Sequence, residues 1–135
     1  MADNLFELQI ICPDRIFYEG SVSMLELNTS EGEVGIYKNH VPMTMIVAPG
    51  VLTITDESGK KEAAVHAGFI EILQDKVTVL AEVAEWPDEI DLKRAEEAKI
   101  RAQRRISERT ADIDLLRAET ALSRAIARIY VVNNI

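Results

Sequence analysis

The chain has 135 residues and a mass of 15.1 kDa, which allows one ordinary domain or a small domain with an appendage and excludes a multidomain enzyme. With 15 basic and 23 acidic residues the formal net charge is -8, so nucleic acid is not expected as a partner. A single cysteine excludes an internal disulfide and a multi-cysteine metal site, and no apolar run approaches the roughly 18 residues of a membrane span. Because acidic residues stand where a signal peptide would be basic, we expect a soluble, non-secreted protein. No metal site is expected.

Residues 1–87 are punctuated by turn-forming residues, and residues 88–135 are not. All 6 glycines and all 4 prolines lie before position 88, and both residue types are costly inside helices. Charge divides at the same place, with 5 basic and 14 acidic residues in the first part and 10 and 9 in the second. The sequence therefore predicts two domains, a turn-rich domain over residues 1–87 and a helical domain over residues 88–135.

The first domain contains short runs rich in Val, Ile and Leu that alternate with polar residues and end at turn signals. In residues 51–55, for example, Leu52 and Ile54 face one way and the two threonines the other. About 9 or 10 short strands are expected, over residues 5–12, 15–18, 21–28, 33–37, 44–47, 50–55, 60–66, 69–73 and 76–83. So many strands without intervening helices predict an antiparallel β-sandwich and exclude a parallel nucleotide-binding sheet.

The second domain contains an internal repeat, because the pattern of residues 90–98 returns 23 residues later at 113–121. Asp91 and Asp114 precede the two helical runs and are suitable N-caps. Apolar positions step by three and four along both runs, and many are alanine, which lets two helices approach closely. We predict an antiparallel two-helix hairpin with its loop at residues 107–112, and hence the fold class α+β. Since an alanine seam buries little apolar area, the hairpin should be able to detach.

Arginines form a face beside the apolar seam of each helix. They recur at spacings of 7 and 4 residues, at Arg94, Arg101 and Arg105 and again at Arg117, Arg124 and Arg128. On periodicity alone, a solvated basic face partly neutralised by neighbouring glutamates is the simpler interpretation. The alternative is that guanidinium groups of both helices converge on a phosphate chain, whose oxygens suit their planar forks.

Other residues give little sign of catalysis. The sequence has no metalloprotease, nucleophile-elbow or phosphate-loop motif. We interpret His66 as a sheet-face residue and Cys12 as a small core residue. Trp86 stands at the domain boundary, where we expect it to pack the two domains together.

Residues 30–42 resemble the Glu-Gly-Glu-x-Gly-Ile-Leu/Tyr-Pro-Gly-His-x-Pro loop of the epsilon subunits of bacterial F-type ATP synthases. Residues 68–71 and 77–81 are similar to two further segments of that family, and the resemblance covers the whole chain. One departure is Lys38-Asn39, where the family usually has Pro-Gly. Asparagine tolerates the left-handed backbone that glycine adopts, whereas the loss of proline and the added positive charge bear on how the loop meets its partner.

The resemblance implies a noncatalytic central-stalk subunit, with no enzyme activity of its own. In the family this subunit helps couple the catalytic headpiece to the proton-driven rotor in ATP synthesis, at the cytoplasmic face of the bacterial membrane and only within the complex. The implied partners are the gamma subunit, the c subunits of the rotor ring and, for an extended hairpin, the alpha and beta subunits of the headpiece. The positions that match the rotor contact are Glu33 and His40. The extended hairpin is expected to inhibit ATP hydrolysis.

Some bacterial members bind ATP on the folded hairpin through an Ile/Leu-Asp-x-x-Arg-Ala motif, which residues 90–95 match. The resemblance thus implies an ATP site made of Glu85, Ile90, Asp91, Arg94, Ala95, Arg101, Arg124 and Arg128. ATP would be a regulatory ligand that stabilises the folded hairpin, and no cofactor is required. The same short pattern recurs at residues 113–118.

Two other classes of function stay open on the sequence. A free-standing nucleotide sensor would bind ATP without a rotary partner, so capture of a gamma subunit discriminates it. An enzyme that used His40 with Glu31 or Glu33 would turn over substrate as an isolated chain, and His40→Ala would abolish that turnover.

Overall fold

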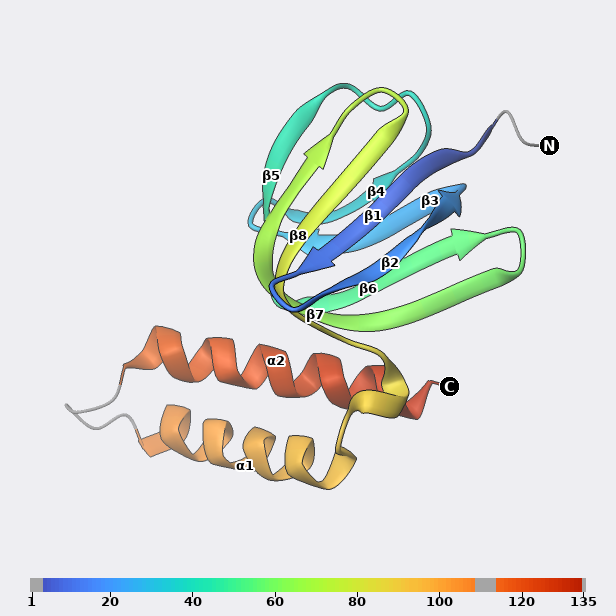
Figure 1. Cartoon of the computed structure of the whole chain (residues 1–135). Helices are drawn as coiled ribbons and strands as arrows, with labels where there is room; N and C mark the ends of the chain where they lie inside the picture. The colour runs from blue at the N-terminus through green and yellow to red at the C-terminus, as the bar shows by residue number, and fades with distance from the viewer. Residues whose placement is uncertain (1–3, 109–113, 135) are drawn as a thin grey trace.

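The computed structural model describes residues 4–108 and 114–134 as eight strands, the short 3-10 helix η2 and two α-helices (Figure 1). The strands are β1 (Phe6–Cys12), β2 (Arg15–Val22), β3 (Met24–Thr29), β4 (Gly32–Ile36), β5 (Met43–Val47), β6 (Gly50–Asp56), β7 (Gly59–Ile72) and β8 (Lys76–Glu85). The helical elements are η2 (Pro87–Glu89), α1 (Leu92–Glu108) and α2 (Leu115–Asn133). The predicted α+β class, a strand domain followed by a two-helix hairpin, is confirmed.

The strands form one sheet that folds over into the two layers of a sandwich (Figure 1). Its order is β2-β1-β8-β7-β5-β3-β4, and β6 pairs with both β3 and β7. The pairs are antiparallel except for β1 and β8, which run parallel. Alternation along β1 buries Phe6, Leu8, Ile10 and Cys12 in the core, so the interpretation of Cys12 as a core residue is confirmed.

Strand β7 differs from the prediction, because residues 60–66 and 69–73 were expected to form two strands. The single strand bends at Ala67 and Gly68, whose φ angles are 63° and 138°. A Cβ at Gly68 would collide with the main-chain carbonyl of Leu80, so glycine is required there. Before the bend β7 pairs with β6, and after it with β5. The bend is therefore where β7 changes its partner strand.

The linker after β8 is fixed to the sandwich. Arg15 donates two hydrogen bonds to the Glu89 carboxylate, at 2.7 and 2.8 Å, and the Trp86 backbone N–H donates a third at 2.8 Å. The Trp86 ring stacks on Phe17 with the ring centroids 4.2 Å apart. Trp86 thus packs on the strand core, and its expected role in joining the two domains stays a prediction.

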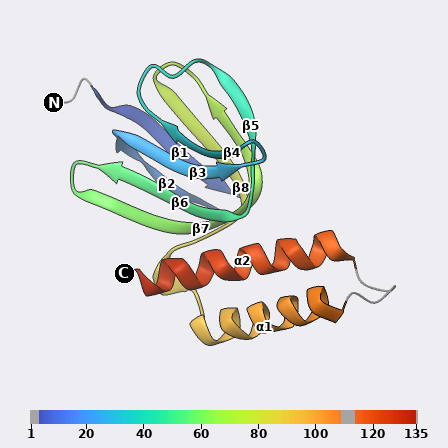
Figure 2. The ribbon, with the colours of Figure 1, turned by 180° about the vertical axis from the view of Figure 1, so that it is seen from behind.

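Helix α2 lies between α1 and the sandwich, as two opposite views show (Figures 1 and 2). The predicted alanine seam is buried at Ala95 and Ala102 of α1 and at Ala118 and Ala125 of α2. The helix α1 extends through Glu108, into the predicted loop, and residues 109–112 of that loop lie outside the described residues.

Both helices begin at the predicted aspartate caps. Asp91 accepts a hydrogen bond from the backbone N–H of Arg94, and Asp114 accepts one from that of Arg117, each at 3.1 Å. A capping carboxylate satisfies a helix N–H that has no intrahelical partner. The repeat in the sequence therefore corresponds to two copies of the same local helix start, although residue 113 itself lies outside the described residues.

Candidate functional site at the sandwich–hairpin interface

The hairpin meets the sandwich through a small apolar contact. Ala127 and Val131, on one face of α2, pack with Ala64 of β7, and Val51 and Ile90 flank them. Burial free energy grows with apolar area, and two of the three fully buried members are alanines. The apolar contribution to docking is therefore small.

An ion pair joins α2 to the sandwich beside this contact. Arg128 of α2 donates from Nε to Oε1 of Glu85, the last residue of β8, at 2.7 Å. Burial raises the pKa of the Glu85 carboxyl, but His66 and Arg128 together outweigh burial and hold that pKa below its ordinary value. Glu85 therefore meets Arg128 as a carboxylate at neutral pH.

Two buried groups near this pair have no hydrogen bond within the described residues. The His66 ring is 1% exposed, its Nε2 lies 3.4 Å from Glu85 Oε1, and neither ring nitrogen is hydrogen-bonded. Arg124, one turn before Arg128, has a buried Nε that is also without a partner. A buried donor without a partner costs about 1–3 kcal/mol. The docked interface therefore contains buried nitrogen atoms of His66 and Arg124 that have no hydrogen-bond partner among the described residues.

The other predicted ATP-site residues lie on α1 or at its N-terminal cap. Asp91 caps the helix, and Ala95 is buried in the seam between the helices. Arg94 and Arg101 are exposed. Among the described residues, no hydrogen bond or ion pair connects these two arginines to Glu85 or Arg128.

The structure therefore brings part of the predicted set together and leaves part of it apart. Glu85, Ile90 and Arg128 meet at the sandwich–hairpin interface, and Arg124 lies one turn from them on the same helix face. The exposed arginines of α1 stand outside this group. The exposure of Arg94 and Arg101 agrees with a solvated basic face, and the convergent phosphate site stays a prediction.

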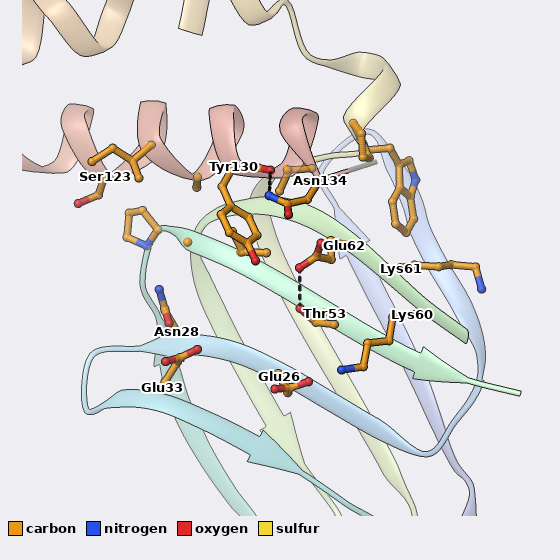
Figure 3. A pocket seen from close by; sticks show the side chains of 18 of the residues that line it. Glu26, Asn28, Glu33, Thr53, Lys60, Lys61, Glu62, Ser123, Tyr130 and Asn134 are labelled. Atoms are coloured by element: carbon orange, nitrogen blue, oxygen red, sulfur yellow. Dashed lines mark hydrogen bonds between the residues drawn. The ribbon is translucent and has the colours of Figure 1, made fainter. Parts of the chain in front are cut away.

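A groove of about 1430 Å³ opens between α2 and the outer face of the sheet (Figure 3). Ile126 and Tyr130 of α2 line one side, and Glu26, Glu33 and Lys60 of the strands line the other. Side chains of both charge signs thus face the hairpin across the groove. Glu33, predicted for rotor contact, is one of the strand residues that line this groove.

Two protein-family models match the chain. The model of the ATP synthase delta/epsilon chain beta-sandwich domain matches residues 5–87, and that of the long alpha-helix domain matches residues 88–133. The chain belongs to the ATP synthase delta/epsilon family. By that membership it is a non-catalytic subunit, as the resemblance implied.

Curated relatives in this family are similar over most of their length. The chain is 42% identical over 108 residues to the ATP synthase epsilon chain of Caldanaerobacter subterraneus subsp. tengcongensis, covering 79% of this chain and 78% of that one. It is 39% identical over 104 residues to the ATP synthase epsilon chain of Caldicellulosiruptor bescii, covering 77% and 76%.

Solved structures share the fold of this delta/epsilon chain. A chain of the Euglena gracilis mitochondrial ATP synthase OSCP/F1/c-ring structure aligns with a TM-score of 0.80 at 22% identity, covering 92% of this chain and 79% of that chain. A chain of the Tetrahymena thermophila mitochondrial ATP synthase central stalk/c-ring structure aligns with a TM-score of 0.56 at 14% identity, covering 96% and 94%. Within the described residues, no helix is long and apolar enough to cross a membrane.

His40 is the other residue predicted for rotor contact. It belongs to the loop between β4 and β5, which lies at the end of the sandwich away from the hairpin (Figure 1). The backbone N–H of Asn39 donates to the main chain of the β7–β8 turn at 3.0 Å. Asn39 has a φ of 65°, the left-handed conformation expected at this departure from Pro-Gly. In the described part of the chain, no hydrogen bond connects His40 to Glu31 or Glu33, the pairing that the enzyme alternative needs.

An apolar row across the sheet was not predicted from the sequence. Ile46, Phe69 and Leu80 are cross-strand neighbours on β5, β7 and β8, and each is at least half exposed. Ile11 and Ile16 continue the row through β1 and β2. We call these five residues the apolar stripe. The signal was present in the strand alternation, because positions expected to face solvent carry Ile, Phe and Leu.

Proposed function

We propose that the chain is the epsilon-type central-stalk subunit of an F-type ATP synthase, which couples the catalytic headpiece to the proton-driven rotor at the cytoplasmic face of a bacterial membrane. Family membership and relatives named ATP synthase epsilon chain support this assignment. The observation that carries the proposal is the contrast between a rigid sandwich with an exposed apolar stripe and a hairpin docked on it by a small contact.

The sandwich is the part that holds the subunit in the complex. The apolar stripe, which includes Phe69 and Leu80, is the surface proposed for the gamma subunit, because large exposed apolar side chains gain stability when a partner covers them. The loop that carries His40 lies at the far end of the sandwich and is proposed to meet the rotor-ring c subunits. Glu33, the second residue proposed for rotor contact, lines the groove between the sheet and α2 and not the loop that carries His40.

The hairpin is the movable part, and we assign it the inhibition of ATP hydrolysis. It is held by α2 through one small apolar cluster and the Glu85–Arg128 ion pair. A switch between docked and extended states requires states that differ by only a few kcal/mol, and a contact of this size allows that. In the extended state the hairpin is proposed to reach the alpha and beta subunits of the headpiece.

ATP is proposed as the regulatory ligand of the docked hairpin. Arg124 has a buried Nε without a partner, Arg94 and Arg101 are exposed, and phosphate oxygens are the acceptors that guanidinium groups prefer. A ligand that binds the docked state alone stabilises it in proportion to the logarithm of its concentration. High ATP would then keep the hairpin docked and release inhibition.

Calorimetric titration of the full chain with ATP tests the regulatory role. Saturable binding is expected for the natural chain and is expected to be lost in Arg124→Ala and Arg128→Ala. Arg117→Ala is the matched control, because Arg117 is an exposed arginine on the same helix. Absence of binding at millimolar ATP would refute the regulatory role and leave the stalk assignment standing.

Capture on a purified gamma subunit tests the stalk assignment. The natural chain is expected to be retained, and Phe69→Asp is expected to lose retention because it places a charge in the apolar stripe. Glu57→Ala, on the exposed β6–β7 turn, is the control. A chain that binds ATP but is never retained by gamma would be a free-standing nucleotide sensor.

A further inference from the structure

We propose that His66 is a positioning residue, which holds the Glu85 carboxylate where Arg128 can bind it and thereby sets how firmly the hairpin docks. The inference rests on the proposed function only in that docking is taken to regulate the complex. The arrangement itself is a property of the isolated chain.

His66 lies beneath the hairpin. It precedes the bend of β7 and pairs across the sheet with Val83 of β8. Ala64, two residues earlier, packs against α2, and residues two apart on a strand face the same side of a sheet. The buried ring of His66 therefore faces the hairpin, on the side where Glu85 meets Arg128.

The ring has an acceptor within reach, and that acceptor is the atom that binds the hairpin. His66 Nε2 lies 3.4 Å from Glu85 Oε1, which also accepts the 2.7 Å hydrogen bond from Arg128 Nε. Within the described residues neither ring nitrogen has a hydrogen bond. Since an imidazole always carries at least one N–H, and a buried N–H needs an acceptor, His66 favours the Glu85 rotamers that keep Oε1 close.

This restriction matters because Glu85 is a flexible side chain at the rim of the interface. The side chains of Glu85 and Arg128 are 24% and 29% exposed. Ion pairs near the surface contribute little when two long side chains must be ordered to form them. A carboxylate whose rotamers His66 already restricts loses less freedom when it pairs with Arg128, so the pair stabilises docking more strongly.

The test measures the docked fraction of the full chain by pulsed electron paramagnetic resonance. Spin labels are placed on cysteines at Glu57, in the β6–β7 turn, and at Glu119 on α2, both exposed positions. The background carries Cys12→Ser to remove the native thiol. A single narrow distribution of label-to-label distances reports the docked hairpin, and a broad distribution reports the undocked hairpin.

His66→Phe removes the N–H at similar volume, and His66→Gln keeps an N–H near the position of Nε2. The docked-to-undocked ratio is expected to fall roughly tenfold in His66→Phe and to be largely retained in His66→Gln. Should His66→Phe unfold the sandwich, His66→Leu takes its place with the same expected loss. An unchanged docked fraction in these apolar variants would overturn the inference.

A double-variant comparison separates positioning from a general packing role. In the Arg128→Ala background, where Glu85 has no hairpin partner to meet, His66→Phe is expected to change the ratio by less than about twofold. A packing role predicts the full effect in both backgrounds and no rescue by glutamine, and that pattern would also overturn the inference. Loss of ATP binding or of inhibition in the natural chain would refute the proposed function without altering this result.

Discussion

In the sandwich the largest fully buried side chains include Leu8, Ile10 and Leu52, whereas all but one of the buried side chains in the described part of the hairpin are alanines. Because the free energy of burial grows with apolar area, at about 25 cal/mol per Å², the two domains differ in how strongly they are held. The sandwich also has strand ladders that connect every layer, while the hairpin reaches it through α2. We call the strongly held sandwich the frame and the weakly attached hairpin the arm.

The largest expected effect comes from the frame. Leu52→Ala should lower the free energy of unfolding by about 2–5 kcal/mol, because it removes methylene groups from a fully buried site and leaves a cavity. Urea denaturation measures this loss. Ile126→Ala, at a half-exposed position of α2, is the control and should change stability little. Equal losses in both variants would contradict the difference between the domains.

A charge at the docking contact should separate the arm from the frame. Ala127→Glu places a carboxylate against Ala64, and an unpaired buried charge costs at least about 2 kcal/mol, so we expect the hairpin to undock. Hydrogen exchange should then quicken in α2 and stay slow in the sandwich core. Ser123→Glu, at an exposed position of α2, is the control. Acceleration of the core strands to the same extent would show that the domains are not separable.

The two aspartate caps sharpen the comparison within the hairpin. Asp91→Ala and Asp114→Ala should each cost about 1 kcal/mol of helix stability, because they remove matching caps. Thermal melts followed by circular dichroism measure that cost. We expect weaker ATP binding in Asp91→Ala only, since Asp91 belongs to the proposed site. Equal weakening in both variants would mean that Asp91 acts solely as a cap.

Acid should release the arm before it unfolds the frame. The pKa of Glu85 is lowered in the docked state, so its stabilisation of docking is present above the ordinary value of 4.5 and is lost as the pH falls through the lowered value. In the sandwich, hydrogen bonds from Lys61 and Ser58 lower the pKa of Asp56 to about 2, so the β6–β7 turn keeps its ion pair at lower pH.

Spin-label distances measured between pH 7 and pH 3 check this order. Undocking is expected on the acid side while the near-ultraviolet spectrum of the sandwich is unchanged. Glu85→Gln, which has no carboxyl to protonate, should lack the acid-dependent step. A transition of the same size in Glu85→Gln would assign the pH dependence to another group.

Local patterns in the sequence predicted the elements well. Alternating apolar residues located the strands, and the repeat of residues 90–98 at 113–121 predicted two helices that begin at Asp91 and Asp114. The left-handed backbone of Asn39 also followed from residue type. These features depend on nearby residues, which is why they were accessible.

Features that depend on residues far apart in the sequence could not be predicted from local patterns. Ala67-Gly68 has the local character of a turn, and its role as a bend inside β7 comes from the change of partner between β6 and β5. The burial of His66 depends on a helix about 60 residues further along the chain. Trp86 lies at the domain boundary in the sequence, yet its ring stacks on Phe17 of β2, about 70 residues earlier in the chain.

A covalent lock between frame and arm tests the central claim most directly. Ala64 and Ala127 pack in one cluster. When both are changed to cysteine in a Cys12→Ser background, a disulfide between them would hold the hairpin docked. ATP hydrolysis of the assembled complex is then measured at low ATP, oxidised and reduced, with the two single-cysteine variants as controls. We predict an uninhibited rate when the pair is oxidised and inhibition when it is reduced. The same rate in both states of the locked variant would contradict a hairpin that leaves the sandwich to inhibit hydrolysis.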